Sequence, residues 1–267
     1  MRTRYPGWAD LLGRAILCVV LMTCGANAQQ VSGPAADRLA FFYTNPQPQR
    51  LIEIFTDMQN RALPWSAYPP VTGLAAAVFK LHPEGIDQLV PSIKDVKAAY
   101  ALIAASRLSG QSAKAEALRA RFANLGADER LNAEFTGLPS RIEDLRITTP
   151  THLDIFWGAS FAGGDGHYVL PIIDYFANAA NASELVAIDI ARIAISIGGG
   201  PKDILAGLKE KYGEANARQM IFAATALWAI RSNALQHPFV RQTVTKYIGD
   251  HPGTPATKAL SVVTGIK

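Results

Sequence analysis

The strongest constraint on the fold is a helical period that runs through most of the chain. Apolar residues recur at the spacing of one helix face, and proline or glycine interrupts them roughly every 10 to 18 residues. Within PQPQRLIEIFTDMQNRAL, four apolar residues occupy the i, i+3, i+4 and i+7 positions, namely Leu51, Ile54, Phe55 and Met58. No run of strand and turn signals interrupts this pattern. The sequence therefore predicts an all-α fold.

Proline and glycine mark where these helices begin and end. Prolines fall at expected first turns, where a missing N–H costs least, and glycines follow expected last turns. The prolines are Pro46, Pro69, Pro83, Pro91, Pro150, Pro201 and Pro238, and the glycines are Gly110, Gly126, Gly163 and Gly198. We expect about ten helices joined by short turns. This organisation predicts stacked antiparallel helical hairpins of the α-solenoid or α-α superhelix type.

The least regular stretch, residues 137–149, separates two expected helical halves. The N-terminal half spans residues 29–136, and the C-terminal half spans residues 150–267. Arg50–Phe55 and His152–Phe156 echo each other across this division, but the echo is too short to establish a repeat.

Three local patterns in the C-terminal half carry further expectations. Asn181, with Glu184 three residues later, predicts a capping box at the start of a helix. The alternation in Ile193–Ile197 is strand-like, but its Ala-rich context predicts helix. Met220–Ile230 is apolar almost all round, which predicts a central buried helix.

The first 28 residues have the organisation of a secretory signal peptide. Three arginines precede a short apolar run, Ala15–Met22, and Ala26 and Ala28 supply the small residues that a signal peptidase reads. The run is much shorter than the roughly 20 residues that a membrane span requires. We therefore expect export to the periplasm with cleavage after Ala28.

A lipid anchor is the lesser alternative to simple export. Leu21–Cys24 resembles a bacterial lipobox, which would acylate Cys24 and tether the chain to a membrane. Met22 and Thr23 match that pattern poorly. We expect membrane association only if Cys24 is lipidated.

Cysteine use and charge exclude several classes of function. Both cysteines, Cys18 and Cys24, lie in the expected signal peptide, so the remaining chain has no disulfide and depends on its core. The formal net charge of +4 falls to about +2 once the signal peptide is removed. So small a charge gives no basic patch, and we expect no nucleic-acid partner.

The glycine-rich stretch FWGASFAGGDGHYV combines Ser160, Asp165 and His167. We interpret it as a corner between two helices, with Thr149 as the N-cap of the first helix and glycines ending that helix at about residue 162. Asp165 should accept a hydrogen bond from the backbone N–H of His167 or Tyr168. A capping carboxylate is poorly placed to orient a catalytic imidazole, and the strand-turn-helix elbow of a serine nucleophile is missing.

The sequence also gives little support for a metal site or a phosphate-binding loop. His152 and Asp154 should lie at the opposite end of their helix from Asp165 and His167, roughly 12 Å from the turn. No two histidines lie within four positions of each other, and the segment expected to remain after cleavage has no cysteine. Gly198–Lys202 departs from the phosphate-loop pattern and predicts a helix stop followed by a helix start. We expect no catalytic residue, no metal site and no cofactor.

Asn233 and His237 follow the buried helix and lie four residues apart. They could share a helical face, as helix caps or as part of a binding groove. The tryptophans Trp65, Trp157 and Trp228 are interpreted as core residues at helical spacing.

Three segments resemble a family of uncharacterised bacterial exported or envelope proteins: WSAYPPVTGLAAAVFKLHPEGI, LDIFWGASFAGGDGHYVLPII and ALWAIRSNALQHPFV. The matching residues are Leu153, Asp154, Trp157, Phe161, Gly164, Asp165, Tyr168, Val169, Asn233, His237 and Pro238. The resemblance implies an all-helical fold and supplies no mechanism.

The sequence thus favours an exported all-helical protein that acts as a protein-interaction or scaffold module, with another envelope protein or a peptide as its partner. An envelope enzyme or small-ligand-binding protein, with a site between the two halves near Trp157, Asn233 and His237, is the alternative. The candidate binding residues are Asp154, Trp157, Asp165, His167, Tyr168, Asn233 and His237.

Overall fold

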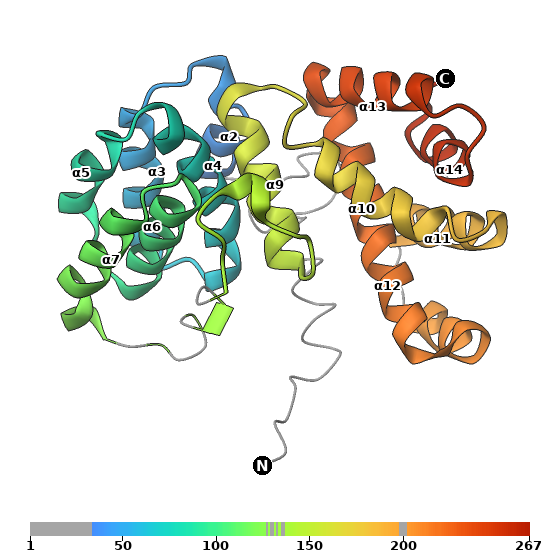
Figure 1. The fold of residues 1–267 in the computed structure, drawn as a ribbon, viewed down its shortest axis with the longest axis horizontal. Coiled ribbons are helices and arrows are strands. Elements are labelled where there is room, and N and C mark those ends of the chain that lie inside the picture. Colours follow the sequence, from blue (N-terminus) through green and yellow to red (C-terminus); the bar gives the residue numbers. More distant parts are fainter. Residues whose placement is uncertain (1–33, 127, 129–130, 132, 135–136, 198–201) are drawn as a thin grey trace, which may run out of the picture. The chain divides into compact units, whose positions relative to one another are not determined.

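A computed structural model describes residues 34–267, apart from 127, 129–130, 132, 135–136 and 198–201 (Figure 1). These described residues are largely helical, and the one extended pairing among them is an isolated bridge between Ser109 and Arg141. The all-α class predicted from the sequence is therefore confirmed. The expected helix boundary at residues 198–201 lies outside the described residues.

The helices belong to two compact units, Met1–Gly164 and Asp165–Lys267. The first unit contains α2 (Pro34–Ala40), α3 (Gln49–Asn60), α4 (Tyr68–Leu81), α5 (Gly85–Leu89), α6 (Val96–Leu108), α7 (Ser112–Arg121) and α9 (Pro150–Gly163). Its short 3-10 helices are η1 (Phe42–Thr44), η2 (Trp65–Ala67), η3 (Val90–Ser92), η4 (Ala123–Leu125) and η5 (Ile142–Asp144). The second unit contains α10 (Leu170–Ala180), α11 (Glu184–Ser196), α12 (Lys202–Gln236), α13 (Pro238–Asp250) and α14 (Pro255–Thr264).

The division between the units differs from the expected one. The sequence placed it in residues 137–149, whereas the compact units divide after Gly164. The reason is that α9, although it follows the irregular stretch, packs against α4 of the first unit. The division instead coincides with the glycine-rich turn that ends α9.

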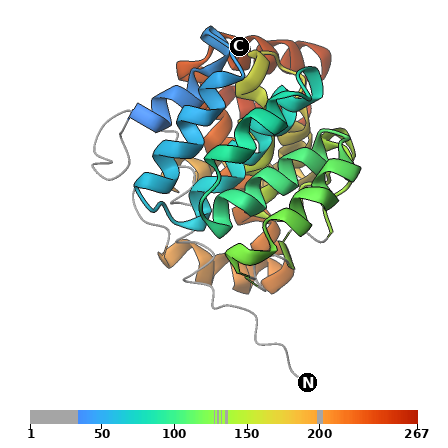
Figure 2. The same ribbon diagram turned by 90° about the vertical axis from the view of Figure 1, so that its left-hand side faces the viewer.

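Local sequence explains the outer helices of the first unit. The buried residues of α3 are the four that the period predicted, Leu51, Ile54, Phe55 and Met58. Helix α6 begins after Asp95, whose carboxylate accepts a hydrogen bond of 2.8 Å from the backbone N–H of Ala98. Gly110 follows α6 with a φ of +88°, which ends the helix and allows α7 to pack beside it (Figure 2).

The core of the first unit is the crossing of α4 and α9. Every residue from Tyr68 to Phe79 is buried, as is every residue from Leu153 to Phe161. A Cβ atom at Gly73 would lie 1.8 Å from the carbonyl oxygen of Ile155, and one at Gly158 would lie 1.7 Å from that of Pro70. The two backbones therefore touch, and this contact requires glycine on both helices.

The second unit is organised around α12, which contacts α10, α11, α13 and α14. Met220, Leu227 and Ile230 are buried, so the prediction of a central buried helix in this segment is confirmed. Gly213 interrupts α12 with a φ of +77°, which divides it into two helices. The segment Ile193–Ser196 is helical, as expected, and forms the end of α11.

The stacked-hairpin arrangement is not confirmed. Repeats of a solenoid contact only their sequence neighbours. In the first unit α4 packs against both α6 and α9, although α5, α6 and α7 lie between α4 and α9 along the described part of the chain. In the second unit α12 contacts all four other helices instead of one neighbour on each side.

Candidate functional site

Helices α11 and α14 of the second unit lie side by side, and their starts are set by local sequence. Ser183 is the N-cap of α11, and its hydroxyl accepts a hydrogen bond of 3.2 Å from the backbone N–H of Val186. Thr254 is the N-cap of α14, and its hydroxyl accepts a hydrogen bond of 3.2 Å from the backbone N–H of Thr257. Pro255 opens α14, where its missing N–H costs nothing.

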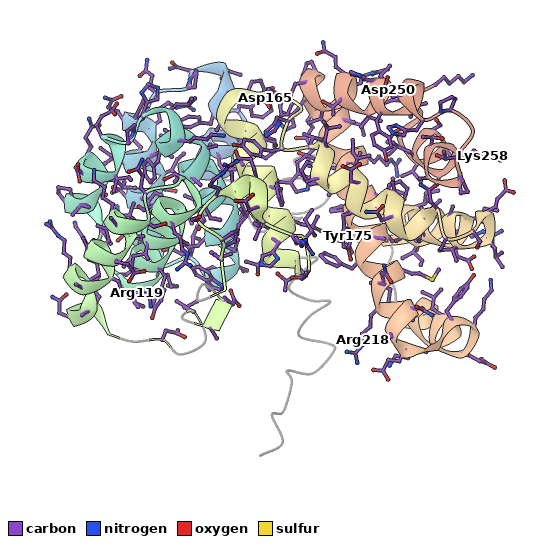
Figure 3. The ribbon with its side chains drawn as sticks, in the orientation of Figure 1. Arg119, Asp165, Tyr175, Arg218, Asp250 and Lys258 are labelled. Carbon is purple, nitrogen blue, oxygen red and sulfur yellow. The ribbon has the colours of Figure 1, made fainter. Side chains whose placement is uncertain are left out.

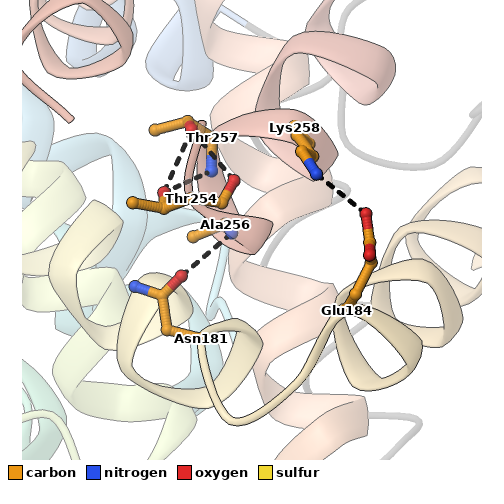
Figure 4. Close-up of polar contacts among 6 residues, drawn as sticks. All are labelled: Asn181, Glu184, Thr254, Ala256, Thr257 and Lys258. Carbon is orange, nitrogen blue, oxygen red and sulfur yellow. Dashed lines mark hydrogen bonds and ion pairs between the residues drawn. The ribbon is translucent and has the colours of Figure 1, made fainter. Parts of the chain in front are cut away.

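Asn181 fixes the start of α14 against the turn between α10 and α11. Its Oδ1 accepts a hydrogen bond of 3.0 Å from the backbone N–H of Ala256, in the first turn of α14 (Figure 4). This N–H would otherwise lack an intrahelical acceptor. The predicted capping box is therefore wrong in its first residue, because Ser183 caps α11 whereas Asn181 caps a helix 75 positions further along the chain.

An exposed ion pair joins the two helices at the same end. Lys258 on α14 donates to Glu184 on α11, with Nζ 2.8 Å from Oε1 (Figure 4). The ammonium group of Lys258 lowers the pKa of Glu184, so this carboxylate stays charged. Lys258 extends from the outer side of α14 (Figure 3).

Between α11 and α14 an apolar groove of about 260 Å³ opens to solvent. Three buried alanines form its floor, Ala187, Ala191 and Ala259. Its rim carries Ile188, Ile195, Pro255 and Val262, together with Glu184, Arg192 and Lys258. The alanines leave the groove open because their side chains are too short to fill the space between the helices.

The rim is unusually apolar for an exposed surface. Among the described residues eight large hydrophobic side chains are exposed, and four of these lie on α11 and α14. They are Leu185 at 52 %, Ile188 at 43 %, Ile195 at 54 % and Val262 at 71 %. Isolated exposed leucines or isoleucines need no explanation, whereas a cluster beside a groove is a candidate binding surface. Three of the four, Ile188, Ile195 and Val262, line the groove, and with the three alanines we call them the α11/α14 groove.

A second hollow, of about 440 Å³, lies on the other side of α11. At its edge Asp189 accepts hydrogen bonds of 2.7 Å from Lys211 Nζ and from the Tyr212 hydroxyl. Burial alone would raise the pKa of Asp189, but these hydrogen bonds lower it below its ordinary value. The same hydrogen bond raises the pKa of Lys211. This ion pair joins α11 to α12.

The residues predicted from the glycine-rich stretch form a corner. Gly164 ends α9 with a φ of +64°, and Asp165 Oδ1 accepts 2.8 Å from the N–H of His167, as predicted. Helix α10 begins only at Leu170, so Asp165 closes the turn instead of capping the helix. A Cβ atom at Gly166 would lie 2.0 Å from Thr243 Oγ1, which explains the glycine there.

The side chains of this corner have different exposures. Asp165 and His167 are exposed, whereas Tyr168 is buried and makes an edge contact with the His167 ring at 4.8 Å. Ser160 is buried in α9, where its hydroxyl donates 2.7 Å to the carbonyl of Trp157. The hydroxyl of Ser160 is therefore hydrogen-bonded within its own helix.

Asp154 and Trp157 lie in the buried part of α9, in the first unit. Trp157 stacks on Phe161 with ring centroids 6.2 Å apart, and its Nε1 has no hydrogen-bond partner among the described residues. This surrounding agrees with the interpretation of Trp157 as a core residue. A binding role for either side chain stays a prediction.

Asn233 and His237 lie in the second unit, where α12 meets α13. Asn233 is buried and its Nδ2 donates 2.9 Å to the carbonyl of Ala229, while its Oδ1 lacks a partner among the described residues. His237 is the N-cap residue of α13 and is buried near Phe239. Burial lowers the pKa of His237 to about 4, so the imidazole is neutral at neutral pH.

Sequence reasoning missed the α11/α14 groove. One signal was present, because Leu185, Ile188 and Ile195 share a helix face with Arg192 at spacings of 3, 4 and 3. That is the pattern of a helix seam. The second wall, α14, could not be inferred because it lies some 60 residues further along the chain.

No described helix is long and apolar enough to cross a membrane. The described residues also contain no group of three or more His, Cys, Asp or Glu side chains that could hold a metal ion. Comparison of the chain with protein families, with curated proteins and with solved structures finds no match.

Proposed function

We propose that this chain is an exported protein-interaction module, and that the α11/α14 groove is where a helix of another polypeptide binds. The observation that carries the proposal is that three exposed aliphatic side chains, Ile188, Ile195 and Val262, line a groove whose buried part is formed by alanines. A groove with aliphatic residues at its rim and small residues at its bottom can bind the apolar face of an amphipathic helix, whose large side chains fill the groove. The signal-like first 28 residues support export to the periplasm.

The groove supports binding better than catalysis. Its floor and rim are aliphatic, and its charged groups stand at the edges, where Glu184 pairs with Lys258 and Arg192 approaches Asp189 at 3.6 Å. Catalysis would need convergent polar groups inside the hollow.

The proposal can be tested by capture from envelope extract with the full chain and two matched variants. Ile188→Asp places a charge on the groove, and Leu81→Asp makes the same kind of change at a leucine that is 75 % exposed on α4 of the first unit. We expect the wild type and Leu81→Asp to retain the same stoichiometric protein, and Ile188→Asp to lose it by at least about tenfold.

Equal recovery with all three chains would show that the groove is not the binding surface. Recovery of nothing above an unrelated exported bait, at low salt, would contradict the interaction function unless the purified chain associates with itself. Export is checked separately by the amino terminus of the protein recovered from the host, which we expect to begin at Gln29.

A further inference from the structure

Helix α11 carries its charges asymmetrically on the face beside the groove. Glu184 begins the helix and Arg192 lies eight residues later, which is about 12 Å along the axis. Both side chains are exposed, at 66 % and 76 %. Ile188 lies midway between them and is itself exposed. A helix with this order of charges is self-complementary when a second copy runs in the opposite direction.

We propose that the occupant of the α11/α14 groove is α11 of a second copy of this chain, packed antiparallel about a two-fold axis that passes near Ile188. This inference rests on the proposed interaction function and names its partner. An isologous contact of this kind is the commonest form of homo-oligomer, because one patch serves both sides.

One register brings two kinds of contact together. With Ile188 opposite Ile188 of the second copy, Glu184 lies opposite Arg192 of that copy, and each interface contains this pair twice. Ile188 is exposed and lines the groove, so the aliphatic contact lies between the two pairs of charges.

A parallel arrangement fails on the same residues. It would place Glu184 beside Glu184 and Arg192 beside Arg192, so that like charges face each other. It would also align the helix dipoles, whereas the antiparallel arrangement opposes them. Charge therefore selects the direction, and the aliphatic residues provide the contact area.

The size of the surface predicts how tight the contact is. Helix α11 has 13 residues and α14 has 10. Side by side they present a face of roughly 20 Å by 20 Å, or about 800 Å² over both copies. Interfaces of this size are at the weak end of specific association, so we expect a dimer that dissociates on dilution in the micromolar range.

The test is sedimentation velocity of the purified full chain over concentrations from about 1 μM to 1 mM, with variants of the groove. We expect the wild type to dimerise and Ile188→Asp to remain monomeric, while Leu81→Asp dimerises like the wild type. Circular dichroism checks that each variant is folded.

Charge reversal gives a sharper measurement, because it tests direction as well as surface. Glu184→Arg and Arg192→Glu should each weaken self-association by about tenfold, since each creates two like-charge contacts per dimer. An equimolar mixture of the two variants restores both opposite-charge contacts, so heterodimers should form with about the wild-type affinity. A parallel dimer would not be weakened by either single reversal.

A wild-type chain that stays monomeric throughout overturns the self-association proposal, as does a dimer that Ile188→Asp leaves intact. Capture of a different protein through the groove would then keep the interaction function while replacing its partner. A monomer that captures nothing contradicts both.

Discussion

The two units use small residues between packed helices to opposite effect. Where α4 crosses α9, Gly73 and Gly158 let the backbones touch and exclude all space between them. Where α11 lies beside α14, buried alanines line the inner part of the groove and leave it open to solvent. Exposed aliphatic residues of both helices form its rim. The first arrangement completes a core, and the second displays a surface. Small residues therefore predict that two helices pack closely, but they do not predict whether the space between the helices is filled by side chains or left open.

The largest effect is expected where the contact is closed. Gly158→Ala would place a methyl group 1.7 Å from the carbonyl oxygen of Pro70, which the backbone of α4 has to move to admit. We expect the free energy of unfolding of the first unit to fall by at least about 3 kcal/mol. Urea unfolding followed by fluorescence in a Trp8→Phe, Trp228→Phe background measures it, because Trp65 and Trp157 are then the remaining tryptophans and report on this unit.

Gly207→Ala is the control for this glycine substitution, and because Gly207 lies in the second unit its effect is measured with Trp228 retained as the fluorescent reporter. Gly207 lies in helix α12, and nothing occupies the 4 Å around the position of an added Cβ atom. The substitution should leave stability unchanged or raise it by up to about 1 kcal/mol. If Gly158→Ala were as mild as this control, the close contact of α4 and α9 would be incorrect.

Acid should weaken the second unit through His237. Because burial lowers the folded-state pKa to about 4, the unfolded chain takes up the proton first as the pH falls below 6.5. Stability is therefore full above pH 6.5 and falls between pH 6.5 and 4, by roughly 1–3 kcal/mol. His237→Gln removes this dependence, and urea unfolding at pH 7 and pH 4.5 compares the two chains.

A smaller effect is expected from the residue that positions α14. Asn181→Ala removes the acceptor for the N–H of Ala256 and should cost about 1 kcal/mol. Faster hydrogen exchange at the first turn of α14 is the most direct measurement. Asn181→Asp keeps an oxygen acceptor and should retain the protection. Equal exchange in the alanine variant would mean that this bond does not position α14.

The sequence was most informative where one helix face decides the structure. The buried face of α3 follows from its period, and the turn closed by Asp165 follows from the chemistry of a short carboxylate before an amide. Both depend on residues within a few positions of each other, so no tertiary knowledge is needed.

Contacts between segments far apart in the chain could not be predicted from the sequence. Asn181 is equally plausible as a cap for its own helix, and only the position of α14 decides that it binds Ala256 instead. Gly73 and Gly158 gave a partial signal, since a glycine inside a helix costs about 1 kcal/mol and implies a packing reason. The identity of the helix that packs there comes from the fold. The α11/α14 groove is of the same kind, because neither wall forms a groove alone.

The crossing of α4 and α9 also sets the order in which the first unit can form during synthesis. Helix α4 is buried from Tyr68 to Phe79, and the largest surface that covers it is made only when Pro150–Gly163 has been added. At roughly 5–20 residues per second, the ribosome takes several seconds to reach that point. Until then α4 is covered only in part, chiefly by α6. Because the contact through Gly73 and Gly158 forms only after α9 is synthesised, the nascent chain is most prone to aggregation before that point.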